Sequence, residues 1–331
     1  MQVVVVDRND GSFASRLNRS PYANLNVAGL SWERLFEEVY RSIIKPMPPW
    51  LDVRVFPTAT TAPTGVAWWG DELLVSDEKL AQVSRVGVGD SQVLLPGLHR
   101  PHHIFRDRNT LFVANTDAHE VLACLIDNGL LARVTSLSYP EFEFRKPHCA
   151  TRNGKTLAIA DSDNDRIIIS QLRADGRKWD IVEHDFKHPC GVAFGGNLLW
   201  VADTFSHRIV ALSESGHFLA SFGQEGEGPA EFRYPVAVDC WNDLVFVADE
   251  GNSRLMMIQL RVRESRRHLV PIESAVASNW IRKPFGISIN RERQLAVSDR
   301  RERCIWIIDL ESLPSMELED RTIHVGVRRL P

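Results

Sequence analysis

The sequence predicts an all-β protein, a six-bladed β-propeller with an N-terminal α-helical extension. A segment of similar pattern recurs six times, and each copy contains short runs of β-branched and aliphatic residues separated by Gly, Asn and Asp turns. A repeat of about 40–50 residues with three or four strands is typical of propeller blades. One such blade buries both faces of its sheet only by packing between two neighbours, so we expect a closed ring.

Each copy carries three landmarks. A proline begins the first strand of the copies, at Pro63, Pro101, Pro147, Pro189, Pro235 and Pro284. The second strand ends at an acidic or amide residue, at Asp77, Asn115, Asp161, Asp203, Asp249 and Asp299. Six residues later an aliphatic residue begins a third strand, at Val83, Val121, Ile167, Ile209, Leu255 and Ile305. Segments such as 217–224 supply the fourth, outer strand.

The fourth copy carries a family resemblance. Its sequence is HPCGVAFGGNLLWVADTFSHRIVALSESGHFLASFGQEGEGPAEFRYP, which resembles the NHL repeat in its P-x-G-V-A step, its V-A-D-x-x-x-H-R-I step and its Gly-rich end. Residues 188–255 match closely, and more degenerate copies extend the resemblance over about 60–310. The resemblance implies a six-bladed propeller, a scaffold that hosts enzymes, RNA binders and protein binders alike.

Residues 1–50 do not fit the repeat, and we expect an N-terminal extension followed by a propeller over 51–331. An apolar stripe with Ser31 as its N-cap predicts an amphipathic helix over 31–45, packed on the side or end of the propeller. A plug over the channel or a partner-docking helix is the alternative. We expect 51–56 to close the ring by pairing into the sixth blade, with 322–327 as the competing segment.

Composition restricts the class of protein. The 331 residues carry a net charge of −4, so no overall charge draws the chain to nucleic acid or to a membrane. The five cysteines are odd in number and form no C-x-x-C pair, which argues against a disulfide framework. No apolar stretch reaches the length of a signal peptide core or a membrane span, and we expect a cytoplasmic protein.

The residue after each landmark proline is expected at the mouth of the central channel. Around the ring this post-proline position holds Thr64, His102, His148, Cys190, Val236 and Phe285. His102, His148 and Cys190 thus occupy three consecutive blades and are suitable ligands for a divalent metal, with zinc favoured and iron or copper as alternatives. Strand alternation points His103 and Cys149 away from the channel. The alternative is structural: histidines that bind neighbouring carbonyls and a small buried cysteine.

A weaker similarity links these residues to peptidyl-α-hydroxyglycine α-amidating lyase, a six-bladed propeller with a channel zinc held by histidines. In that family some of the histidines stand in a Pro-His step, so the resemblance implies zinc ligation by His102 and His148. Those lyases are secretory proteins with disulfides. Their catalytic tyrosine and arginine match no specific position in this chain.

The loops that enter the inner strands are rich in cations. We expect ligand-binding residues here, at Arg100, Lys146, His188, Arg233, Tyr234 and Lys283. Such a rim attracts a small anionic molecule or an acidic peptide. Alternatively these side chains are solvated or pair with Glu141, Glu143 and Glu231. RNA stacked on Tyr234 and Trp280 is a further alternative, disfavoured by a pI near 6.3, and no DNA or membrane partner is expected.

The remaining motifs are structural. The acidic turn 161–166 lacks the glycine and glutamate of a calcium loop. Arg166, Arg208 and Arg254 recur one residue before the third-strand anchor, which predicts an ion pair with the aspartate of each blade. The function that the sequence favours is binding of a small anionic ligand at a basic channel mouth, with metal-dependent lyase or hydrolase chemistry. The alternative is a non-catalytic NHL scaffold that binds protein or single-stranded RNA.

Overall fold

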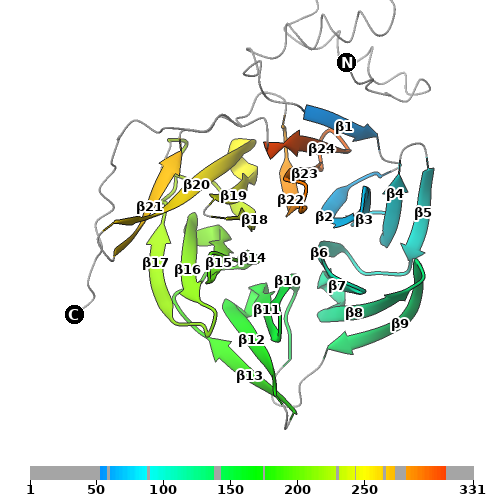
Figure 1. The fold of residues 1–331 in the computed structure, drawn as a ribbon, viewed down its shortest axis with the longest axis horizontal. Coiled ribbons are helices and arrows are strands. Elements are labelled where there is room, and N and C mark those ends of the chain that lie inside the picture. The colour runs from blue at the N-terminus through cyan, green and yellow to red at the C-terminus, as the bar shows by residue number, and fades with distance from the viewer. Residues whose placement is uncertain are drawn as a thin grey trace, which may run out of the picture.

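The chain folds into six four-stranded antiparallel sheets arranged around a central axis (Figure 1). The computed structural model describes residues 53–57, 60–87, 90–137, 143–173, 176–228, 231–242, 244–263, 266–272 and 281–310. The predicted helix over 31–45, the segment 322–327 and Trp280 lie outside the described residues. The six-bladed propeller predicted from the repeat is confirmed.

Each blade contributes one strand to each of four concentric layers. The innermost strands are β2 (Pro63–Trp69), β6 (Pro101–Asp107), β10 (Pro147–Asn153), β14 (Pro189–Gly195), β18 (Pro235–Trp241) and β22 (Pro284–Ile289). The second strands are β3 (Glu72–Asp77), β7 (Thr110–Asn115), β11 (Thr156–Asp161), β15 (Leu198–Asp203), β19 (Leu244–Asp249) and β23 (Gln294–Asp299). The third strands are β4 (Gln82–Gly87), β8 (Glu120–Asp127), β12 (Arg166–Arg173), β16 (Arg208–Ser213), β20 (Arg254–Arg263) and β24 (Cys304–Asp309). The outer strands are β5 (Asp90–Leu95), β9 (Leu130–Leu137), β13 (Gly176–Val182), β17 (Phe218–Phe222), β21 (Arg266–Ile272) and β1 (Val53–Pro57).

Short 3-10 helices follow the second strands of four blades. They are η1 (Thr116–Ala118), η2 (Ser162–Asn164), η3 (Thr204–Ser206) and η4 (Glu250–Asn252). Among the described residues, none of the helices has the length and hydropathy that crossing a membrane requires. All five cysteines are free thiols in the structure.

The landmark residues mark strand ends. Every inner strand begins at its proline, and every second strand ends at its Asp or Asn. The two residues are paired across the sheet, as in Pro147 with Asp161 and Pro189 with Asp203. The loops that enter the inner strands and the turns that leave the second strands therefore share one face of the ring, which we term the channel mouth.

The ring closes through the N-terminal strand. β1 pairs antiparallel with β24, in register from Val53 with Ile308 to Pro57 with Cys304. Segment 51–56 was predicted to enter the sixth blade, and this pairing confirms it. The first and last described strands thus lie side by side in one sheet (Figure 1).

The hydrophobic core lies between the blades. Five buried clusters each combine residues of two neighbouring sheets, including one between the first and sixth blades, and a sixth cluster joins the fifth and sixth blades with Cys190 of the fourth. Strand β3 shows how: Leu73 and Val75 pack toward the sixth blade, while Leu74 packs toward the second. This period of two follows from the pleat, and burial of each such side chain contributes about 1.5–3 kcal/mol.

The blade aspartates fix the loops of the channel mouth. The carboxylate of Asp203 accepts the Lys187 backbone N–H at 2.7 Å and binds the Arg208 guanidinium at 2.7 Å. Equivalent ion pairs join Arg166 to Asp161 and Arg254 to Asp249. The predicted structural role of the three arginines is confirmed.

Candidate functional site

A β-bulge at the start of each inner strand positions the post-proline side chains. Register shifts directly after the proline in all six inner strands, for example between Pro147 and Cys149. A bulged residue lacks a regular partner and its side chain is re-aimed. The rings of His102 and His148 meet edge-on at 4.3 Å, and His102 meets Phe285 at 5.3 Å. Because His102 and Phe285 belong to blades that flank the first blade, these side chains converge at the channel mouth.

Three residues of this cluster bring metal-binding atoms together. One ligand atom from each of His148, His188 and Cys190 lies within 4.8 Å of the other two. Two of the three, His148 and Cys190, are post-proline residues that the sequence predicts as ligands. The third is His188, which the sequence places among the ligand-binding rim residues. His102 contacts His148 but stands outside the group, with its Nε2 3.7 Å from Glu78 Oε2.

His188 reaches the group through its backbone conformation. It precedes the proline of β14 and has φ of 50°, and Arg100, Lys146 and Tyr234 at equivalent positions also have positive φ. Asp165 accepts its backbone N–H at 2.7 Å, which holds this strained conformation. The imidazole Nδ1 lies 3.2 Å from Asp163 Oδ1. A carboxylate on one ring nitrogen leaves the other free to bind a metal, and such pairs are typical of metal-bound histidines.

Burial keeps these groups uncharged. It lowers the pKa of His102 and of His188, and lowers that of His148 well below the usual value, with His102 and His188 adding to the effect. The imidazoles are therefore neutral at neutral pH, the form that binds metals. Burial also raises the pKa of the Cys190 thiol to about 12. A metal ion would have to displace that proton to bind sulfur.

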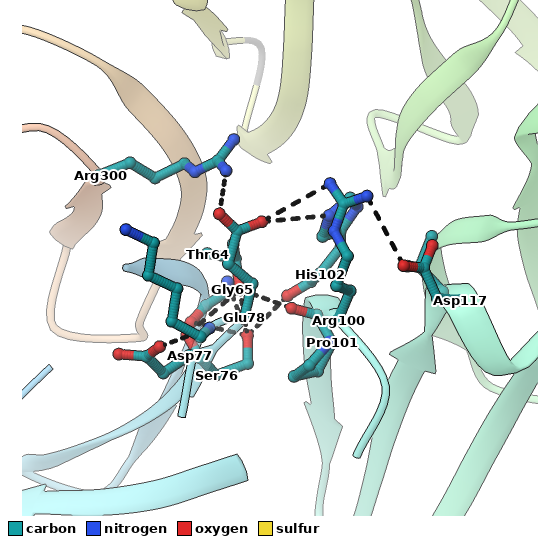
Figure 2. Close-up of polar contacts among 12 residues, drawn as sticks. Thr64, Gly65, Ser76, Asp77, Glu78, Arg100, Pro101, His102, Asp117 and Arg300 are labelled. Atoms are coloured by element: carbon teal, nitrogen blue, oxygen red, sulfur yellow. Dashed lines mark hydrogen bonds and ion pairs between the residues drawn. The ribbon is translucent and has the colours of Figure 1, made fainter. Parts of the chain in front are cut away.

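Glu78 links the histidines to two arginines. It follows β3, and Figure 2 shows its carboxylate between Arg300 on one side and His102 and Arg100 on the other. His102 and then Arg300 lower the pKa of Glu78 to about 2, against the burial that raises it. Arg300 also lies 3.8 Å from Glu250. The turns of the first, fifth and sixth blades thus form one ion-pair network at the mouth.

Several polar atoms at the mouth are buried without a hydrogen-bond partner. They are Glu78 Oε2, His148 Nδ1 and both ring nitrogens of His102. His102 is only 4% exposed, so its nitrogens obtain little compensation from solvent. A buried polar atom without a hydrogen bond costs about 1–3 kcal/mol, and four such atoms lie together at this mouth.

The cations of the rim have carboxylate neighbours. Arg100 lies 3.6 Å from Asp117, Lys146 lies 3.8 Å from Asp163, and Lys283 lies 3.2 Å from Glu250. Arg233 pairs with Glu227 at 2.9 Å. Among the described residues these partners differ from Glu143 and Glu231, and Glu141 lies outside the described residues. The side chains of Arg100, Lys146 and Lys283 are 41–52% exposed, and exposed pairs of this kind are weak.

His103 and Cys149 form a separate pair away from the metal-binding group. Cys149 is 1% exposed, packs in the core between the third and fourth blades, and has its Sγ 3.1 Å from His103 Nδ1. Burial raises the pKa of Cys149 and lowers that of His103 to about 4. Both groups are therefore neutral, and the prediction that they face away from the mouth agrees with this packing.

The structure resembles solved propellers of several activities. It matches virginiamycin B lyase from Staphylococcus aureus with a TM-score of 0.52 and 14% identity, covering 78% of this chain and 99% of the lyase. It matches a putative gluconolactonase with a TM-score of 0.56 and 12% identity, covering 79% and 93%. It matches a luciferin-regenerating enzyme with a TM-score of 0.56 and 10% identity, covering 78% and 95%.

These similarities show the fold alone, because so few residues are shared. The sequence matches no protein-family model, and no curated protein is significantly similar to it. The propeller fold is thus shared with a lyase, a luciferin-regenerating enzyme and a putative gluconolactonase, while the chemistry of this chain has to be argued from its own residues.

Proposed function

We propose that the channel mouth binds a divalent metal, most readily zinc, and that the protein is a metal-dependent lyase or hydrolase acting on a small anionic molecule. The observation that carries this proposal is the grouping of His148, His188 and Cys190, whose ligand atoms lie within 4.8 Å of one another. Solved propellers of the same fold, named as a lyase and a putative gluconolactonase, support the reaction class as an analogy.

The residues fit a zinc ion in number and kind. Two imidazoles and one thiol are typical zinc ligands, and three protein ligands leave a fourth position for water or substrate. Bond lengths of about 2.0–2.3 Å place tetrahedral ligands about 3.5 Å apart, so the side chains would move by about 1 Å. The neutral imidazoles and the carboxylate of Asp163 behind His188 favour binding. When bound, the metal would act as a Lewis acid or activate water.

The neighbouring residues have separate roles in this proposal. Lys146 and Arg100 are half-exposed on the rim beside the histidines, and they would hold the anionic part of the substrate. His102, neutral and unpaired, would accept a proton from the reacting group. Glu78 would orient His102 and balance the positive charge of Arg300.

Metal binding tests the proposal before any substrate is known. We expect purified protein to take up about one equivalent of Zn²⁺ or Co²⁺, measured by elemental analysis, and the Co²⁺ form to show a thiolate-to-metal absorption band. His148→Ala should lose the metal, and Cys190→Ser should lose the band. Cys149→Ser is the matched control, because this buried cysteine lies outside the group.

One further pair of variants separates the two candidate ligand sets. His188→Ala should abolish metal binding, whereas His102→Ala should retain the metal and slow the hydrolysis of small lactones that carry a carboxylate, followed by proton release. Loss of metal in His102→Ala with retention in His188→Ala would restore the set predicted from sequence. Absence of metal, together with salt-sensitive capture of single-stranded RNA or a protein, would support the non-catalytic alternative.

The repeat itself is part of the proposal. We infer that the blades are NHL-type repeats, because the proline, the aspartate that ends the second strand and the following arginine make the same contacts in the third, fourth and fifth blades.

A further inference from the structure

A row of rings leads outward from the candidate metal centre. The His188 imidazole is stacked on Phe205 with centroids 4.6 Å apart and an interplanar angle of 14°. Phe205 meets Tyr234 edge-on at 5.9 Å, and Tyr234 in turn contacts His207 at 4.7 Å. Phe205 is 54% exposed and Tyr234 is 42% exposed. We term Phe205 and Tyr234 the aromatic ledge.

The fold does not require an aromatic side chain at Phe205. Its backbone N–H donates to the carbonyl of Lys187, two residues before the blade proline. Asp117, Asp163 and Gly251 donate in the same way in the second, third and fifth blades. The repeat thus accepts polar residues or glycine at this position, and the exposed phenylalanine of the fourth blade calls for another explanation.

The same comparison applies to Tyr234. The equivalent residues before the proline of β6, β10 and β14 are Arg100, Lys146 and His188, and all share its positive φ. The backbone therefore admits polar side chains at this position. Within the described part of the mouth, Phe205 and Tyr234 are the one pair of exposed aromatic residues from successive blades that contact each other. The candidate ligand His188 stacks on Phe205.

A cation lies near the candidate ligands through a shared carboxylate. Asp163 lies 3.2 Å from His188 Nδ1 and 3.8 Å from Lys146 Nζ, and the Lys146 side chain is 41% exposed. An aromatic face, a metal-binding group and an ammonium therefore follow one another across the fourth and third blades. This order suits a compact molecule with a flat apolar part and a charged part.

We propose that the aromatic ledge is the specificity subsite of the channel mouth and receives a planar aromatic ring whose carboxylate or similar anionic group lies toward Lys146. The assignment of the ring as part of a substrate rests on the proposed function, whereas stacking of the ring does not require the metal. Ring stacking on aromatic side chains contributes about 0.5–1.5 kcal/mol beyond area burial. A small molecule fits better than RNA, because a pI near 6.3 lacks the general basic excess expected of a nucleic-acid-binding domain.

A matched pair of acids tests the subsite in metal-free protein. Phenylacetate and cyclohexylacetate carry the same charge, and only the first has a planar ring. We expect the wild-type protein to bind phenylacetate about threefold to tenfold more tightly, measured by saturation-transfer NMR competition. Equal affinity for the two acids, or no detectable binding of either, would overturn the proposal.

Variants locate the ring. Phe205→Ala and Tyr234→Ala should each remove most of the preference while the circular dichroism stays unchanged, because both side chains are exposed. Phe218→Ala is the matched control: this ring is 44% exposed and lies 4.2 Å from His184, but it belongs to the outer strand of the same blade. A preference that survives Phe205→Ala and Tyr234→Ala, or that falls equally in Phe218→Ala, would place the ring elsewhere.

The outcome separates this inference from the proposed function. A ring preference in a protein that binds no metal would support the ledge and overturn the metal centre. Metal binding without a preference for phenylacetate would support the metal centre and overturn the aromatic ledge. Variants that bind phenylacetate normally but lose a single-stranded oligonucleotide would identify the ledge as a base-stacking platform and overturn the small-molecule assignment.

Discussion

At the scale of single residues, the blade aspartate holds three groups at once. Asp203 is fully buried, accepts the Lys187 backbone N–H and pairs with Arg208, while its backbone pairs with Pro189. The loop that carries His188 is fixed by these contacts. Asp203, a landmark of the repeat, thus fixes the position of the candidate ligand His188.

Removal of this carboxylate should be costly. We expect Asp203→Ala to lower the free energy of unfolding by about 3–5 kcal/mol, because Arg208 and a buried N–H lose their partner. Urea denaturation measures the change. Asp127→Ala, at an exposed strand end, is the control and should stay within about 0.5 kcal/mol of wild type. Similar losses in both variants would contradict the role of the buried pair.

The sequence contained the residues of the candidate site but only part of their grouping. His148 and Cys190 were recognisable because a proline fixes the start of each inner strand. His188 was predicted as a rim residue, because the positive φ that it shares with its equivalents and the contact of its N–H with Asp165 of the preceding blade are not revealed by any local pattern. Glu78 and Phe205 were missed. For Phe205 the signal was present, since the residues at its position in the other blades are all charged or glycine, whereas Glu78 has a matching glutamate, Glu250, in the fifth blade.

At the scale of elements, blades are joined by polar contacts near the axis as well as by the apolar core. The hydroxyls of Thr116, Ser162 and Thr204 donate to the carbonyl of the next blade's proline at 2.6–2.9 Å. Further along the inner strands, Asp239 of β18 accepts the Cys240 N–H and the Ile289 N–H of β22, each at 2.8 Å. The fifth and sixth blades thus share a half-buried carboxylate.

The Asp239 contact should make stability depend on pH. Burial raises the pKa of Asp239 from 3.8 to about 6, so ionisation costs more in the folded than in the unfolded protein. The contribution of protonated Asp239 to the free energy of unfolding is fully present below about pH 4. It is lost as pH rises through about 6, which lowers the free energy of unfolding by roughly 3 kcal/mol. Urea midpoints of wild type should therefore fall relative to Asp239→Asn over that window. A difference between the two proteins that does not vary with pH would contradict this assignment.

At the scale of the whole molecule, the sequence predicted the fold more fully than the site. The ring follows from strand period, turn residues and the need of each blade to bury two faces, all of which repeat along the chain. The site depends on how three different blades face one axis, and on side chains that depart from the repeat. Such departures carry no periodic signal, and their partners, such as Glu78 for His102, are far apart in sequence.

Closure of the ring by β1 leads to a test on the whole chain. Without β1, strand β24 would be an unpaired edge, since Val53 to Pro57 supply its outer hydrogen-bonding partner. We expect a truncation lacking residues 1–57 to unfold at a lower urea concentration and to aggregate, compared with one lacking residues 1–52, which retains β1. The comparison isolates five residues, because both proteins lack everything before Val53. Coincident unfolding curves and equal solubility would show that the sixth blade is stable with three strands, and that the terminal strand does not hold the ring together.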